Sequence, residues 1–117
     1  MRVSAELRAR SKSFASTVIR LFISLPRERP EVAILAKQMI RSGTSVASHA
    51  REASRARTDS EYCSKIDVLL QEADETQLWL ELLQEDCGIT GPRLKQAHHE
   101  AEELLAIFTT IVSRTRN

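Results

Sequence analysis

The residues with the clearest chemical potential are cations spaced along one stretch of the chain. At about 100° per residue most of them share one side of a helix, together with the hydroxyls of Thr44 and Ser48. Cations at this spacing can contact successive backbone phosphates, and hydroxyls can donate hydrogen bonds to them. No aromatic residue interleaves with them, so neither base stacking nor sequence readout is indicated. This basic stripe is the candidate nucleic-acid-binding site and consists of Lys37, Arg41, Arg51, Arg55 and Arg57. A solvated helix face, or ion pairs with the acids of another subunit, is the competing interpretation.

Histidines raise the question of a metal site. A carboxylate-bridged metal pair in a helical bundle requires Glu-x-x-His on two helices, and none of His49, His98 and His99 follows a Glu at that spacing. Neighbouring His98 and His99 point about 100° apart on a helix, so they are poorly placed to hold one ion together. Glu102 and Glu103 are better explained as their surface partners. We predict no metal site.

Other reactive residues form no catalytic arrangement. Glu72, Asp74 and Glu75 fan around one side of a helix, which is typical of a solvated charged face rather than of a proton-transferring pair. Cys63 and Cys87 have no fixed sequence relation to a histidine base. A phosphate-binding glycine-rich loop and a nucleophile elbow are both absent from the sequence. We expect no catalytic residue, no cofactor and no enzymatic activity.

The elements that carry these residues are predicted to be helices. Three Gly, three Pro and 4% aromatic residues leave little material for turns and strands. Apolar residues from Tyr62 to Cys87 follow a four-three alternation, and Thr58 with Glu61 forms a capping-box pattern before them. The chain is long enough for one domain, 1–117, whose predicted fold is an all-α, up-down-up-down antiparallel four-helix bundle. Its helices are expected at about residues 4–24, 30–56, 59–87 and 92–115.

Gly43 lies inside the second of these helices. An interior glycine is either a tolerated weak spot or a place where two helices approach closely. Its neighbours on the same side are mostly small or apolar, from Val32 to Ala53. That position favours close packing.

A second apolar patch lies off the main seam of the third helix. It consists of Leu78, Trp79 and Leu82. One buried stripe suffices for a monomeric bundle, so the patch is a candidate oligomer interface with a second copy of the chain. The alternative is a wide helix face packed between two neighbours within the monomer.

Charge is divided between the two halves of the chain. Residues 1–57 hold 12 Lys and Arg against 4 Asp and Glu, a net +8, whereas residues 58–117 hold 5 against 12, a net −7. If the halves pack against each other, much of this charge could be neutralised within the protein or between subunits. Otherwise a basic patch faces solvent.

The cellular location is predicted from what the sequence lacks. Cys63 and Cys87 would lie about 36 Å apart along one helix, too far for a disulfide. The N-terminal segment does not have the pattern of a signal peptide, and no apolar run approaches the ~20 residues that span a bilayer. We expect a cytoplasmic protein with no membrane partner.

Two consecutive motifs resemble a known family. The first motif is IRSGTSVASHAREASRAR, and the second is SKIDVLLQEADETQLWLELL. Together they resemble the four-helix bundle proteins related to those encoded in intervening sequences of bacterial 23S rRNA genes. The likeness extends from Phe14 to about Ile111. His49 replaces a usual Asn, and Glu52 is its expected partner. The resemblance implies a homopentamer, which would supply a second neighbour for Leu78, Trp79 and Leu82. The matching motif residues are Arg41, Ser42, Thr44, Ser45, Glu52, Glu72, Ala73, Glu75, Thr76, Trp79 and Leu80.

A related branch, the accessory variability proteins of diversity-generating retroelements, is strongly basic and associates with reverse transcriptase and nucleic acid. This chain has a net charge of only +1 and lacks that excess. The leading hypothesis is therefore a non-enzymatic homo-oligomeric scaffold with weak, sequence-independent contacts to RNA or DNA. The alternative is an adaptor that binds another protein and no nucleic acid.

Overall fold

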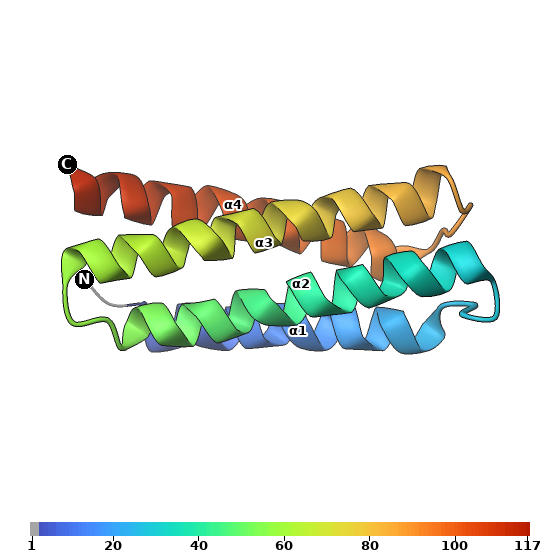
Figure 1. The fold of residues 1–117 in the computed structure, drawn as a ribbon, viewed down its shortest axis with the longest axis horizontal. Helices are drawn as coiled ribbons and strands as arrows, with labels where there is room; N and C mark the ends of the chain where they lie inside the picture. The colour runs from blue at the N-terminus through green and yellow to red at the C-terminus, as the bar shows by residue number, and fades with distance from the viewer. Residues whose placement is uncertain (1–2) are drawn as a thin grey trace.

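The computed structural model describes residues 3–117, and its helices lie lengthwise side by side, with the chain reversing at each connection (Figure 1). Its extents are 45 × 21 × 20 Å. No strand occurs among the described residues, so the prediction of an all-α, four-helix chain is confirmed. The helices are α1 (Ala5–Ser24), α2 (Pro30–Ser54), α3 (Asp59–Glu85) and α4 (Pro92–Arg116).

Local sequence sets the helix ends. The Thr58 hydroxyl accepts a hydrogen bond from the Glu61 N–H at 3.0 Å, so α3 begins where the capping pattern predicts. The Glu61 carboxylate accepts from the Arg57 N–H at 3.3 Å. The second helix ends at Ser54 rather than at about residue 56, which places Arg55 at its C-cap and Arg57 in the connection to α3.

The core is built from one apolar stripe per helix. α1 packs against α2 and α4, and α3 packs against the same two helices. Ser42 of α2 and Thr76 of α3 share a buried hydrogen bond of 2.7 Å, which satisfies two hydroxyls within this core. The predicted seam of α3 is confirmed, because seven of its residues are buried within the helix: Tyr62, Ile66, Leu69, Ala73, Thr76, Leu80 and Leu83. The eighth, Cys87, is also buried but lies beyond the end of α3 at Glu85.

Gly43 of α2 lies directly against Val18 of α1. A Cβ at this position would lie 2.9 Å from both methyl carbons of Val18. Real Cβ atoms do not approach other heavy atoms so closely, so the absence of a side chain permits the contact. The structure supports the close-packing interpretation of this glycine.

A charged clasp joins α1 to α4. The Arg10 Nε donates to Glu100 Oε2 at 2.7 Å, and its Nη2 donates to Glu100 Oε1 at 2.9 Å and to Glu103 Oε2 at 3.1 Å. These bonds raise the pKa of Arg10 and, because the guanidinium favours the ionised carboxylate, hold the pKa of Glu103 below its usual value. Arg10 is thereby neutralised at the protein surface.

Replacing Gly43 with alanine tests the close contact. Helix propensity favours alanine by about 0.5–1 kcal/mol, whereas overpacking a tight site costs about 1–3 kcal/mol, so Gly43→Ala should lower the free energy of unfolding by roughly 1 kcal/mol. Urea denaturation followed by circular dichroism measures the change.

The matched control is the same substitution in a Val18→Ala background, where the opposing methyls are gone. There Gly43→Ala should raise the free energy of unfolding, and the double-mutant cycle should show favourable coupling. Equal effects of Gly43→Ala in both backgrounds would show that Val18 does not limit this site.

Candidate nucleic-acid interface

The five cations of the basic stripe all lie at the protein surface. Each is exposed, while the opposite side of α2 is buried in the core. Within residues 3–117, none of their side chains forms a salt bridge with an acid. Within a single chain, the positive charge of the stripe is therefore not compensated by salt bridges.

The opposite charge of the second half does not neutralise the first half within a chain. Among the described residues, Arg10 is the single basic side chain of the first half that forms a salt bridge with an acid of the second. Glu52 pairs instead with Lys65 and contacts His49. Among the described residues, salt bridges between the two halves are thus limited to the clasp between α1 and α4 and the Glu52–Lys65 pair, and neither involves a cation of the stripe.

A basic hollow lies between α1 and α2. It has a volume of about 280 Å³ and is lined by Arg8, Ala9, Lys12, Arg51 and Arg55. Two of these cations belong to the stripe, and two come from α1. Arg8 and Lys12 are exposed, and neither forms an ion pair within the part of the chain that the structure describes. Sequence reasoning missed this pair, although their spacing of four residues places them on one face of a helix.

The remaining stripe residues lie away from the hollow. Lys37 and Arg41 do not line it, and Arg41 lies about 15 Å from Arg51 along the axis of α2. Arg57 belongs to the connection before α3. The Thr44 hydroxyl, which was predicted as a donor to phosphate, donates to the Ile40 carbonyl at 2.7 Å.

The histidines are held by nearby acids. His49 Nε2 lies 3.6 Å from Glu52, as expected, and His99 Nε2 lies 2.8 Å from Glu103. The expected contact between His98 and Glu102 is wrong. His98 contacts Glu81 of α3 at 2.9 Å, because α3 packs beside α4 and brings that carboxylate within reach.

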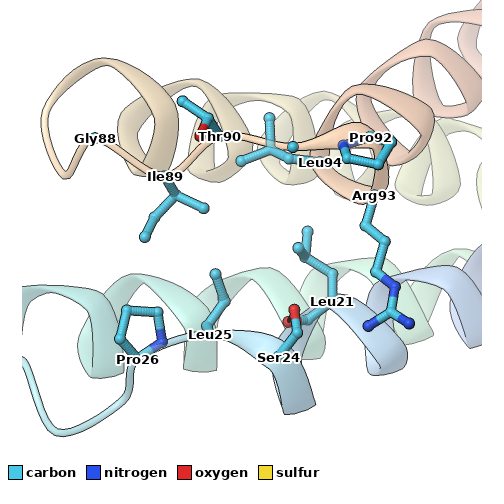
Figure 2. A pocket seen from close by; sticks show the side chains of 11 residues that line it. Leu21, Ser24, Leu25, Pro26, Gly88, Ile89, Thr90, Pro92, Arg93 and Leu94 are labelled. Atoms are coloured by element: carbon cyan, nitrogen blue, oxygen red, sulfur yellow. Dashed lines mark hydrogen bonds between the residues drawn. The ribbon is translucent and has the colours of Figure 1, made fainter.

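A second hollow lies at the end of the bundle where α1 ends and α4 begins. It has a volume of about 370 Å³, and Figure 2 shows Ile89 and Leu94 opposite Leu21 and Leu25, with Arg93 reaching toward α1. No carboxylate, imidazole or thiol lines it. The Ser24 hydroxyl at its edge donates to the Leu21 carbonyl, so this hollow offers no activated nucleophile.

A third hollow, of about 530 Å³, lies between α3 and α4. It contains acids and imidazoles, but His98 is engaged by Glu81, and Glu102 accepts a hydrogen bond from Gln77 at 2.7 Å. Across residues 3–117, no three His, Cys, Asp or Glu side chains gather in a metal-binding arrangement. None of the described helices is long and apolar enough to span a bilayer.

The candidate oligomer interface is only partly accessible. Leu78 is 46% exposed, whereas Trp79 and Leu82 are half-buried. Trp79 also packs against the core of its own chain. Leu78 is therefore the residue of the three that a second copy could cover with the least disturbance of the monomer.

These features define a class of protein: an all-helical, four-helix chain whose α1–α2 edge carries unpaired cations. The chain belongs to the 23S rRNA-intervening sequence protein family, whose model matches residues 4–110. The family resemblance of the two helix motifs is thereby confirmed. No curated protein matches the sequence.

A solved structure supports the same assignment. It is described as a protein with unknown function from the S23 ribosomal protein family of Bacteroides thetaiotaomicron. The two chains are 30% identical, the TM-score is 0.81, and the similarity covers 90% of this chain and 96% of the other. Neither comparison assigns an enzymatic activity.

Stability measurements can distinguish Arg10, which forms salt bridges, from Arg51 and Arg55, which form none among the described residues. Arg10→Gln removes the bonds to Glu100 and Glu103, so it should lower the melting temperature by a few degrees. Arg51→Gln plus Arg55→Gln loses no salt bridge and relieves repulsion between like charges, so its melting temperature should stay the same or rise slightly at low salt. Differential scanning calorimetry at two salt concentrations makes the comparison. A larger loss for the double variant would reveal partners for these cations in solution.

Proposed function

We propose that this protein is a non-enzymatic, single-domain helical scaffold of the cytoplasm that assembles from identical subunits, with five as the expected number. Its basic stripe, Lys37, Arg41, Arg51, Arg55 and Arg57, binds the backbone of RNA or DNA weakly and without sequence preference.

One observation carries the nucleic-acid part of the proposal: no described acid forms a salt bridge with any of these five side chains. Like charges on one face repel each other unless counterions or a polyanion screen them. Arg8 and Lys12 extend the positive surface across α1. A phosphate backbone is the complementary partner for such a surface.

The non-enzymatic part rests on the surface chemistry. No carboxylate or imidazole that could act as a general base lines the hollow at the end of the bundle, and the acids of the hollow between α3 and α4 are engaged by His98 and Gln77. The cytoplasmic assignment is supported by two cysteines, Cys63 and Cys87, that are free rather than joined.

A protein-interaction adaptor is the second candidate. Ile34 of α2 is 64% exposed and Leu78 of α3 is 46% exposed. Large apolar side chains at the surface favour contact with another protein when they cluster. This candidate binds a partner protein and no nucleic acid.

Salt-dependent binding tests the nucleic-acid proposal. Labelled single-stranded RNA of mixed sequence should bind at 50 mM salt and dissociate as salt rises. Arg51→Glu plus Arg55→Glu should weaken binding and flatten the slope of log K against log salt by roughly 1.4, the value for two lost contacts with a single strand. Fluorescence anisotropy measures both quantities.

The charge-matched control is Arg93→Glu plus Lys95→Glu. These exposed residues begin α4, at the end of the bundle away from Arg51 and Arg55. This variant has the same net charge as the test variant and should retain most of the binding. Equal losses in both variants would show that net charge rather than the stripe attracts RNA. No binding by the wild type at low salt would leave the adaptor as the better candidate.

Assembly is tested separately. Leu78→Asp and Leu82→Asp should each reduce the oligomer mass while retaining much of the helix content, because a charge is buried at a subunit contact. Trp79→Ala should also dissociate the oligomer, with an added loss of monomer stability because Trp79 packs against the core. Multi-angle light scattering gives the mass, and circular dichroism gives the helix content.

Ile23→Asp is the control for these interface variants. Ile23 is an exposed apolar residue of α1, outside the proposed interface. Its replacement should leave the oligomer mass unchanged. Full oligomer mass in Leu78→Asp, or dissociation by Ile23→Asp alone, would contradict the assignment of the interface to α3.

A further inference from the structure

The basic hollow between α1 and α2 differs from the open stripe in its geometry. Arg8 and Lys12 approach it from α1, and Arg51 and Arg55 approach it from α2. Ala9 lines the space between them with a single methyl group. A ligand group in the hollow is therefore met by cations from two helices, whereas a group on the stripe is met from one.

The four cations that line the hollow repel one another. No carboxylate lines it, and none of its four cations forms a salt bridge elsewhere in residues 3–117. The neighbouring Arg10, by contrast, turns toward α4 and is neutralised by Glu100 and Glu103. An anion with more than one negative charge would relieve the repulsion between the four cations.

The size of the hollow limits what enters it. Pockets for drug-sized ligands span about 300–1,000 Å³, so a volume of about 280 Å³ suits a smaller group. A terminal phosphate monoester carries a charge of about −1.5 to −2 at pH 7 and three free acceptor oxygens. An internal phosphodiester has a single charge, and its strand continues in both directions. The monoester is the better match to four converging cations.

We propose that this hollow binds the terminal phosphate of a nucleic-acid strand. Arg51 and Arg55 belong to both the hollow and the stripe, so a strand that follows α2 past Arg41 and Lys37 can end with its phosphate between Arg8 and Lys12. The inference rests on the proposed nucleic-acid binding and adds a preference for strand ends to it.

The test compares RNA oligonucleotides of one sequence that carry a 5′-phosphate, a 3′-phosphate or hydroxyls at both ends. The wild-type oligomer should bind one phosphorylated form on the order of tenfold more tightly than the hydroxyl form at low salt. Arg8→Gln plus Lys12→Gln should abolish this ratio. Both residues are exposed and unpaired, so the variant should keep its melting temperature.

Lys37→Gln plus Arg41→Gln is the matched control. It removes two charges from the stripe outside the hollow, so it should weaken all three oligonucleotides and keep their ratio. Arg8→Lys plus Lys12→Arg preserves the charge and should retain the preference. Loss of the ratio in the stripe control as well would assign the preference to general charge and overturn the role of the hollow.

The outcomes separate this inference from the proposed function. Equal binding of phosphorylated and hydroxyl RNA overturns the end preference and leaves backbone binding intact. No RNA binding at all overturns both. Titration with inorganic phosphate and with adenosine monophosphate, followed by calorimetry, distinguishes a strand end from a free phosphate compound. Tight binding of either small anion, with no gain from the phosphate on RNA, would overturn the strand end as the ligand.

Discussion

The contact between Gly43 of α2 and Val18 of α1 sets how closely these two helices approach. A side chain at position 43 would collide with both Val18 methyls at 2.9 Å, so the packing of α1 on α2 depends on its absence. The basic hollow lies farther along the same interface, where Ala9 lies among the longer cations. The spacing that buries Val18 therefore also brings Arg8 and Lys12 within reach of the same hollow as Arg51 and Arg55.

Helical geometry then sorts the charges. Residues adjacent in sequence point about 100° apart, so Arg8 and Lys12 face α2 while Arg10 faces the acids of α4. On α2, Arg51 lines the hollow while Glu52 turns to Lys65 of α3. A chain whose total charge is nearly balanced thus has salt bridges between α1 and α4 and a positive surface along α1 and α2. The proposed partner depends on this separation rather than on the net charge of +1.

Interactions between helices limit what could be predicted. His98 was expected to contact Glu102, four residues along the same helix, but its partner is Glu81 of α3. Glu102 accepts a hydrogen bond from Gln77 instead. Helical spacing predicts which side chains are neighbours on one helix. It does not predict whether a side chain of an adjacent helix will bind the same group instead. For the same reason the sequence does not predict that Arg8 and Lys12 belong to the basic surface, because this depends on which helix packs beside their side of α1.

The sequence by itself determined the four helices, the buried seam of α3 and the five cations of the stripe. These features depend on local propensity, capping residues and apolar spacing, which act over a few residues. The tertiary structure alone decided that the second half of the chain leaves the stripe unpaired and that α1 completes a basic hollow beside α2. Both outcomes depend on which faces of distant helices meet, and the close contact of Gly43 with Val18 is one part of that packing.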